Sequence, residues 1–263
     1  MKTKKLASGF EIPVLGFGTF GIGGDFERNA TNDEKYMQAI QNAIDSGLTH
    51  IDTAEIYGAN HTEDLIGQAT VEYDRTKLFI ASKVSVEHLR YEDVLEAAKK
   101  SLSRLKTEYL DLYLIHGWNP EIPIEETMKA MNTLVDERRV RYIGVCNFTI
   151  KQLKEAQKHS ETKIVMNQMK YCLWTKNLPD LETMRFCQDN DIMITTYKLF
   201  GRGKLEQDRI PLITQIAKKY QKTEAQVITN WIVSKKNTVA IFKSMNKKAY
   251  RREHSSVGIR HGF

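Results

Sequence analysis

The stretch HIDTAEIYG, residues 50–58, places the carboxylate of Asp52 and the phenol of Tyr57 five positions apart, where an apolar run breaks into a polar turn. A single aspartate at the end of a strand is most often a turn or helix cap. A phenol that follows at once is unusual at such a cap. The meaning of this pair therefore depends on the fold that surrounds it.

Short apolar runs alternate with segments of helical period on both sides of this stretch. The predicted strands are VLGFGT (14–19), THIDTA (49–54), LFIASKV (78–84), LDLYLIH (110–116), YIGVCN (142–147), IVMNQM (164–169), IMITTY (192–197) and TVAIFK (238–243). The predicted helices span 34–47, 62–71, 91–105, 123–137, 149–159 and 178–190, and a longer helical stretch runs from 209 through 235. Eight such units close a parallel barrel of about 250 residues, whereas an open doubly wound sheet usually has about five or six strands. The sequence thus favours a (β/α)8 TIM barrel, with an open α/β sheet as the alternative.

Local signals mark the ends of several elements. KLASGFEI (5–12) predicts an N-terminal β-hairpin that turns at Ser8 and Gly9. The spacing of Thr31 and Glu34 predicts a capping box at the start of the first helix, and Gly47 predicts its end.

Length and composition indicate an ordinary globular protein. With 263 residues, of which 41% are hydrophobic, the chain can bury a large core as one domain, residues 1–263; two small domains are the alternative. Lysine and arginine exceed aspartate and glutamate by 39 to 33, and the pI is near 9.0. The basic residues interleave with acidic ones and indicate solvated helix faces rather than a nucleic-acid surface. A basic rim around a phosphorylated ligand is the other interpretation.

The cysteines and the N-terminus indicate the cellular compartment of the protein. Cys146, Cys172 and Cys187 have irregular spacing that fits neither a disulfide framework nor a zinc site, so we expect no metal and a reducing environment. No long apolar segment follows the basic N-terminus, so we expect neither a signal peptide nor a membrane partner. These features predict a cytoplasmic protein.

Titratable residues close three consecutive predicted strands: Asp52, Lys83 and His116. Each alone has a structural interpretation, as a cap, a solvated strand exit or a satisfied core histidine. Neighbouring parallel strands lie about 5 Å apart, and barrel chemistry sits at their carboxyl ends. We therefore expect these three side chains to meet Tyr57 at one pocket.

These residues resemble the aldo-keto reductase family over nearly the whole chain. The segments that carry the resemblance are GFGTF (16–20), HIDTAEIYG (50–58), ASKV (81–84), YLDLYLIHGWNP (109–120), YIGVCNF (142–148), NQMKY (167–171), TTYKLFG (195–201) and VAIFKS (239–244). The resemblance implies a (β/α)8 barrel that binds NADP(H) in extended form and reduces aldehydes or ketones. A Rossmann site would require a G-x-G-x-x-G loop that follows a strand and opens a helix; GFGTFG (16–21) begins inside the first predicted strand, and the next predicted helix starts only at residue 34.

Carbonyl reduction needs a hydride on carbon, which a nicotinamide must supply, and a proton on oxygen. Tyr57 is the candidate acid, and since a free phenol has a pKa of about 10, we expect the ammonium of Lys83 to lower it. Asp52 would keep Lys83 charged. His116 is interpreted as a neutral donor that orients the carbonyl oxygen, with a histidinium acid as the alternative.

The resemblance also implies the cofactor contacts. Asn147 and Gln168 would bind the nicotinamide carboxamide, and Tyr197 would stack on its ring. The pyrophosphate loop would comprise Lys198, Leu199, Phe200 and Gly201, with Lys243 and Ser244 at the 2′-phosphate, which favours NADPH over NADH. Gly18, Thr19, Asp52 and Cys146 complete the implied cofactor set, while Phe20 and Trp118 would line the substrate pocket with Tyr57 and His116.

Some positions depart from the family pattern. Cys146 stands where the family has a serine, and Phe242 where it has a proline. The segment TYKLFG (196–201) replaces a serine-proline-leucine run of the family, and its Lys198 adds a positive charge. NKKAYRREH (246–254) differs from the usual adenine-end pattern, although Arg251 or Arg252 would suit the 2′-phosphate. The tail after the eighth strand is shorter than in many relatives, which predicts an open pocket or indicates a truncated chain.

We therefore expect a monomeric NADPH-dependent reductase of small carbonyl compounds. One alternative is an NADP(H)-binding regulatory or redox-sensing subunit with little turnover. A barrel of unrelated chemistry is a further alternative, since fold alone does not fix function.

Overall fold

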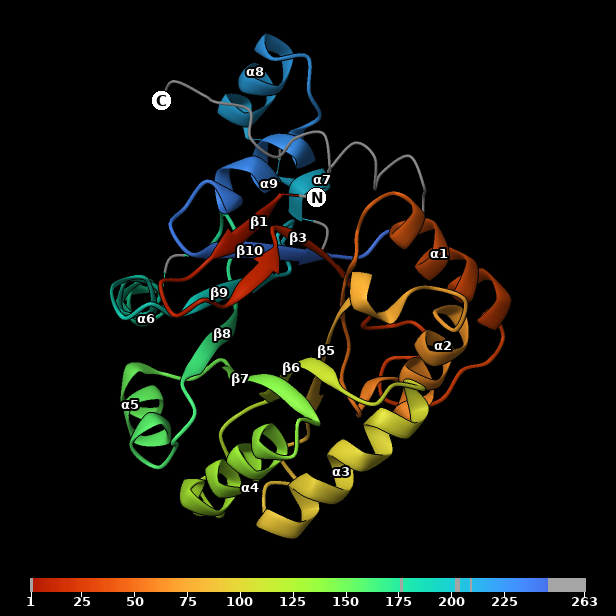
Figure 1. The fold of residues 1–263 in the computed structure, drawn as a ribbon. Coiled ribbons are helices and arrows are strands. Elements are labelled where there is room, and N and C mark those ends of the chain that lie inside the picture. The colour runs from red at the N-terminus through yellow and green to blue at the C-terminus, as the bar shows by residue number, and fades with distance from the viewer. Residues whose placement is uncertain (1, 176, 202–203, 209, 246–263) are drawn as a thin grey trace.

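The structure is a computed structural model that describes residues 2–175, 177–201, 204–208 and 210–245. Eight strands of these residues form a closed barrel in the order β10-β3-β4-β5-β6-β7-β8-β9 (Figure 1). They are β3 (Leu15–Gly18), β4 (His50–Asp52), β5 (Phe79–Val84), β6 (Leu110–Ile115), β7 (Val140–Cys146), β8 (Ile164–Lys170), β9 (Met193–Tyr197) and β10 (Thr238–Phe242). All neighbours in the barrel pair in parallel. The predicted (β/α)8 barrel is confirmed.

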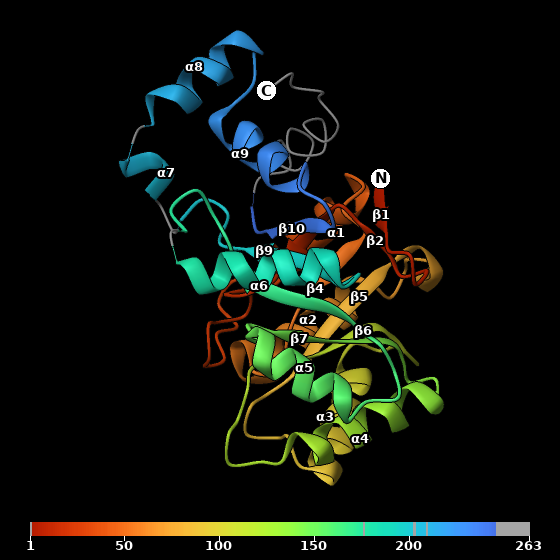
Figure 2. The same ribbon diagram turned by 90° about the vertical axis from the view of Figure 1, so that its left-hand side faces the viewer.

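Helices surround the barrel. They are α1 (Asp33–Asp45), α2 (His61–Ala69), α3 (Tyr91–Arg104), α4 (Ile124–Asp136), α5 (Ile150–Lys158), α6 (Leu178–Asp189), α7 (Lys204–Gln207), α8 (Pro211–Lys219) and α9 (Glu224–Val233), with short 3₁₀ turns η1 (Tyr57–Asn60) and η2 (Arg75–Lys77). Helix α6 packs on β9 and α9 on β10 (Figure 2). None of the helices in the described part of the chain has the length and hydrophobicity needed to cross a membrane.

The hairpin closes the amino end of the barrel. Strands β1 (Thr3–Lys5) and β2 (Glu11–Pro13) pair antiparallel, and Gly9 has a φ of +94° in the turn between them, as predicted. Phe10 packs edge-on against Tyr142 of β7, with ring centroids 4.9 Å apart, and belongs to the apolar cluster inside the barrel. The hairpin thus plugs this end of the barrel, and in barrels of this kind ligands bind at the carboxyl ends of the strands.

The start of α1 differs from the prediction. Its N-cap is Asn32, with no side-chain capping bond, and the backbone N–H of Thr31 donates to Asn29 Oδ1 instead. This short turn holds Thr31 outside the helix, so the predicted capping box is wrong. The end was predicted correctly, because Gly47 follows the helix with a φ of +91°.

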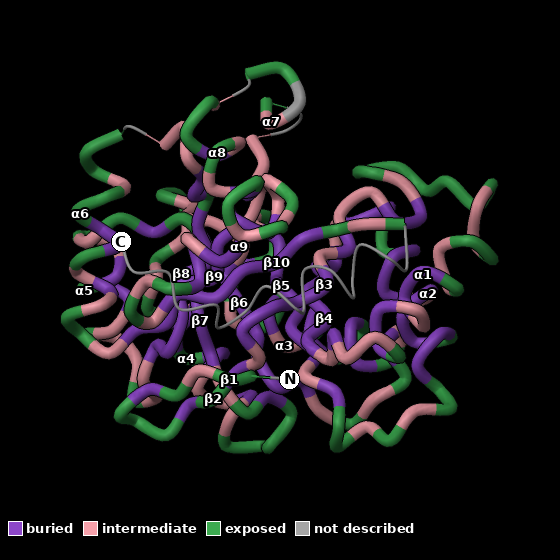
Figure 3. Tube along the Cα trace, turned by 90° about the horizontal axis from the view of Figure 1, so that it is seen from above, coloured by how far each residue is buried: buried purple, intermediate pink, exposed green. Residues whose placement is uncertain are grey.

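The core has two layers. One cluster fills the barrel interior, and a larger one lies between the strands and the helices. Figure 3 shows the barrel strands as a mostly buried centre, while most exposed residues lie on the outer helices and loops. The buried strands provide rigid positions from which the side chains at their carboxyl ends project.

Candidate active site

A cavity of about 930 Å³ opens at the carboxyl ends of the strands. This volume lies near the upper end of the range for ligand sites, roughly 300–1,000 Å³. Its lining includes the predicted residues Gly18, Thr19, Phe20, Asp52, Tyr57, His116, Cys146, Asn147, Gln168, Tyr197, Lys198, Leu199, Phe200 and Lys243. The barrel thus brings together most of the residues singled out from the sequence.

Asp52 and Lys83 form a buried ion pair at the base of this cavity. Lys83 is fully buried, and its Nζ lies 2.7 Å from Asp52 Oδ1 and donates to the carbonyl of Thr53 at 2.6 Å. Burial has the largest single effect and would lower the pKa of Lys83, but the charge and hydrogen bond of Asp52, together with smaller contributions from Tyr57 and Cys146, outweigh it and the pKa is raised. Gln168 Nε2 donates to the second oxygen of Asp52 at 2.7 Å. The ammonium is therefore kept charged by a carboxylate that is itself held in place.

Tyr57 begins η1 and lies over this pair. Its side chain is largely buried, with 9% exposed, and Lys83 Nζ is 5.2 Å from the centroid of its ring. Burial raises the pKa of Tyr57 to about 12, although Lys83 opposes this shift. The prediction that Lys83 brings the pKa below its ordinary value is therefore wrong for this state, because the loss of water around the phenol has the larger effect.

His116 follows β6 and faces Tyr57. The two rings meet edge-to-face with centroids 5.7 Å apart, and the His116 backbone N–H donates to Val84 O at 3.0 Å. Burial, with a further contribution from Lys83, lowers the pKa of His116 to about 4. The imidazole is therefore neutral near pH 7, which favours the neutral-donor interpretation over the histidinium acid.

Amides and an aromatic ring line the next part of the cavity. The Tyr197 hydroxyl donates to Asn147 Oδ1 at 3.0 Å, and Asn147 adopts a φ of +56°, which asparagine tolerates better than most residues. Burial raises the pKa of the Cys146 thiol to about 12, and its Sγ lies 4.0 Å from Gln168 Oε1. Cys146 is thus a neutral thiol and a weaker donor than serine.

Two lining lysines lie on the loops that follow β9 and β10. Lys198 has a φ of +59°, and Lys243 Nζ donates to the carbonyl of Phe20 at 2.7 Å. Gly201 and Ser244 neighbour this region but do not belong to the lining. Arg251 and Arg252 lie outside the described residues, as does the whole predicted tail from residue 246 onward.

The substrate end agrees only partly with the prediction. Phe20 lines the cavity and packs on Tyr57 with ring centroids 5.2 Å apart. Trp118 does not line it; its ring packs edge-on against Phe148, at 5.4 Å. The assignment of Trp118 to the pocket is thus not supported in this structure, because the loop after β6 turns the indole toward the outer core.

Sequence reasoning missed several lining residues: Phe26, Ile56, Ser85, Val86, Glu87, Ile241 and Phe242. A signal existed for Ser85 and Glu87, because they occupy alternate positions after Lys83 beyond a strand whose end had been predicted. No comparable pattern marked Phe26, which lies in the long loop before α1 and is 62% exposed.

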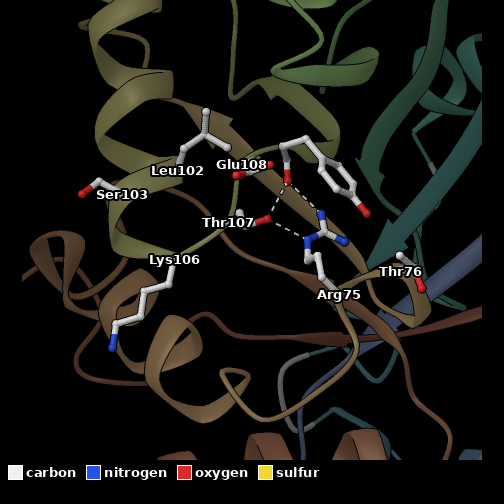
Figure 4. A pocket seen from close by; sticks show the side chains of 8 residues that line it. Arg75, Thr76, Leu102, Ser103, Lys106, Thr107 and Glu108 are labelled. Atoms are coloured by element: carbon white, nitrogen blue, oxygen red, sulfur yellow. Dashed lines mark hydrogen bonds between the residues drawn. The ribbon is translucent and has the colours of Figure 1, made fainter.

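A second hollow, of about 540 Å³, lies at the opposite end of the barrel beside η2 (Figure 4). Its principal cation, Arg75, donates to Thr107 Oγ1, Leu78 O and Tyr109 O, each at 2.8 Å, and pairs with Asp111 at 2.8 Å. Because every nitrogen of this guanidinium is engaged within the protein, we interpret the hollow as structural.

Burial of His50 inside the barrel predicts acid sensitivity. His50 is 1% exposed, and burial lowers its pKa to about 4. In the unfolded chain the His50 ring takes up a proton near pH 6.5, whereas the buried ring stays neutral down to about pH 4. The unfolded state is therefore increasingly favoured, and the stability that the neutral ring contributes is lost, as pH falls from 6.5 toward 4. Between pH 7 and pH 5 the loss is about 2 kcal/mol for this residue. Urea unfolding of His50→Gln at both pH values should show a smaller decrease than the wild type; an equal decrease would contradict the assignment.

The fold and the site together define a (β/α)8 barrel with a buried lysine–aspartate pair beneath a phenol and an imidazole. The model of the aldo/keto reductase family matches residues 14–257. The chain belongs to the aldo/keto reductase family.

Similar proteins agree with this assignment. The glyoxal reductase of Bacillus subtilis (strain 168) is 35% identical over 229 residues, which cover 87% of this chain and 78% of that protein. The methylglyoxal reductase YeaE of Escherichia coli (strain K12) is 31% identical over 237 residues, 89% of this chain and 81% of that protein. The crystal structure of the thermostable aldo-keto reductase Tm1743 with the inhibitor epalrestat superposes with a TM-score of 0.92 at 39% identity, covering 100% of this chain and 96% of that chain. An aldo-keto reductase from Klebsiella pneumoniae in complex with NADPH gives a TM-score of 0.87 at 27% identity, covering 100% of this chain and 92% of that chain.

Proposed function

We propose that this protein is an NADPH-dependent reductase of small aldehydes and ketones, in which Tyr57 is the acid, Lys83 and Asp52 support it and His116 orients the carbonyl. The observation that carries the proposal is the fully buried Lys83–Asp52 pair beneath Tyr57 in an open cavity. Buried charges are costly, and a pair of them beneath a pocket is typical of a functional site. Relatives named as glyoxal and methylglyoxal reductases support the substrate class.

The lining residues fit a dinucleotide. Two amides, Asn147 and Gln168, and the ring of Tyr197 suit a planar carboxamide ring, while the ammonium groups of Lys198 and Lys243 suit phosphates. The buried Nδ1 of His116 has no hydrogen-bond partner among the described residues, as expected of a side chain that serves a ligand. When bound, a reduced nicotinamide would supply the hydride. Support for NADPH comes from the similar structure in complex with it.

Tyr57 would deliver the proton. A pKa of about 12 keeps the phenol protonated throughout the neutral range, so the acid always has a proton to donate. The alkoxide that forms from a carbonyl is a far stronger base than a phenolate, and the transfer is therefore still favourable. Lys83 then stabilises the phenolate that is left behind.

His116 would fix the direction of the carbonyl oxygen. A neutral imidazole donates a hydrogen bond without placing a second cation beside Lys83, whose charge already lowers the pKa of His116. Two donors, the phenol and the imidazole, then meet the charge that develops on oxygen. A cytoplasmic location and a monomeric state stay predictions from the sequence.

The test is NADPH oxidation followed at saturating cofactor with a panel of small aldehydes and dicarbonyl compounds, including glyoxal and methylglyoxal. We expect turnover of several of them and, because Tyr57 and His116 keep one protonation state, a nearly flat rate between about pH 6 and pH 9. Tight NADPH binding without turnover of any carbonyl would instead indicate a regulatory or redox-sensing subunit.

A further inference from the structure

The segment after β5 is a fixed turn at the rim of the cavity. The Ser85 backbone N–H donates to Glu55 Oε1 at 2.6 Å, and the His88 N–H donates back to Ser85 O at 3.1 Å. From the other side, Asn119 Nδ2 donates to Val86 O at 2.9 Å. One hydrogen bond within the turn and two from other parts of the chain therefore hold the backbone that carries Glu87.

Glu87 and His116 both line the cavity. The Ser85 hydroxyl donates to this carboxylate and, with smaller contributions from His88 and His116, lowers the pKa of Glu87. His88 is also partnered with Glu55, through its Nδ1 at 3.0 Å. Glu87 is thus ionised at neutral pH and oriented by a neighbour in its own turn.

The charges around the cavity are unevenly distributed. Asp52 is neutralised by Lys83, and the lining lysines Lys198 and Lys243 come from the loops that follow β9 and β10. Among the lining residues that the structure describes, Glu87 is the acidic one without an ion-pair partner. Within this lining, Glu87 therefore contributes a negative charge that no ion pair neutralises.

We propose that Glu87 selects substrates by charge, disfavouring carbonyl compounds that carry a carboxylate and favouring neutral or cationic ones. This inference rests on the proposed reductase function and adds the class of substrate to it. Neither Tyr57 nor His116 can make this discrimination, because both are neutral at the pH of the reaction.

The effect is moderate, because Glu87 is exposed and solvent screens its charge. For a matched pair of aldehydes, such as para-nitrobenzaldehyde and para-carboxybenzaldehyde, we expect kcat/KM in the wild type to favour the neutral compound. The variant Glu87→Gln should raise kcat/KM for the carboxylated aldehyde by about fivefold and change that for the neutral one by less than about twofold. In about 0.5 M NaCl the difference between variant and wild type should shrink.

Glu108→Gln is the matched control, because Glu108 is exposed at the opposite end of the barrel. It should leave the ratio of the two substrates unchanged. Equal changes for both aldehydes in Glu87→Gln, or no change, would overturn the proposal.

Calorimetric binding of benzoate and benzamide to the protein with NADP⁺ separates this inference from the proposed function. If no aldehyde is turned over, the reductase proposal fails, but tighter binding of benzoate to Glu87→Gln by about fivefold, with benzamide unaffected, would still support charge selection. Unchanged benzoate binding would contradict it.

Discussion

Tyr57→Phe should lower kcat for NADPH-dependent aldehyde reduction by roughly a hundredfold to ten-thousandfold, the usual contribution of a positioned acid. The phenyl ring keeps the packing against Phe20 and His116, at centroid distances of 5.2 and 5.7 Å, so the cavity should keep its shape. The hydroxyl is the one group lost, and with it the proton donor. Steady-state NADPH oxidation measures the loss, and quenching of protein fluorescence should give an NADPH Kd within about twofold of the wild type.

Tyr73→Phe is the matched control. The Tyr73 hydroxyl donates to Asp45 at 2.9 Å on the surface, so its removal should leave kcat unchanged. If Tyr57→Phe kept more than about a tenth of the activity, Tyr57 would not be the acid, and His116 would be the next candidate.

The barrel itself was predictable because it depends on short-range patterns. Each buried strand, such as Leu110–Ile115, is a continuous apolar run, and each is followed by a segment with the helical period. Eight repetitions leave few alternatives at this length. The start of α1 was not predictable in the same way, because Asn29 competes for the backbone N–H of Thr31.

The base of the site was predictable for a related reason. Asp52 and Lys83 end adjacent strands, and parallel pairing puts Asp52 opposite Ala81, two residues before Lys83. The positions of residues that lie on loops do not follow from this strand register. The loop after β6 turns Trp118 toward Phe148, and the loop before α1 brings Phe26 to the mouth. The pKa of Tyr57 was missed because it depends on how deeply η1 buries the phenol.

Lys83→Met should reduce both stability and turnover. It leaves Asp52, only 2% exposed, as a buried charge without its cation, which costs about 3–5 kcal/mol of unfolding free energy. Without the ammonium the Tyr57 phenolate also loses its stabilisation. With Lys83 Nζ 5.2 Å from the centroid of the Tyr57 ring and an effective dielectric near 20, that interaction is worth about 3 kcal/mol, so kcat should fall by up to roughly a hundredfold.

A second variant separates the two effects. Asp52→Asn/Lys83→Met carries no charge at the base of the cavity and keeps an amide oxygen that can accept from Gln168 Nε2. We expect its unfolding free energy in urea to return to within about 1–2 kcal/mol of the wild type, because removal of a whole buried pair costs little. Its kcat should stay as low as that of Lys83→Met, since Tyr57 still lacks the positive charge. Recovery of kcat together with stability would mean that the pair only supports the fold. Low kcat in a stable double variant would instead show that Lys83 acts on the proton of Tyr57, and that Asp52 acts through Lys83.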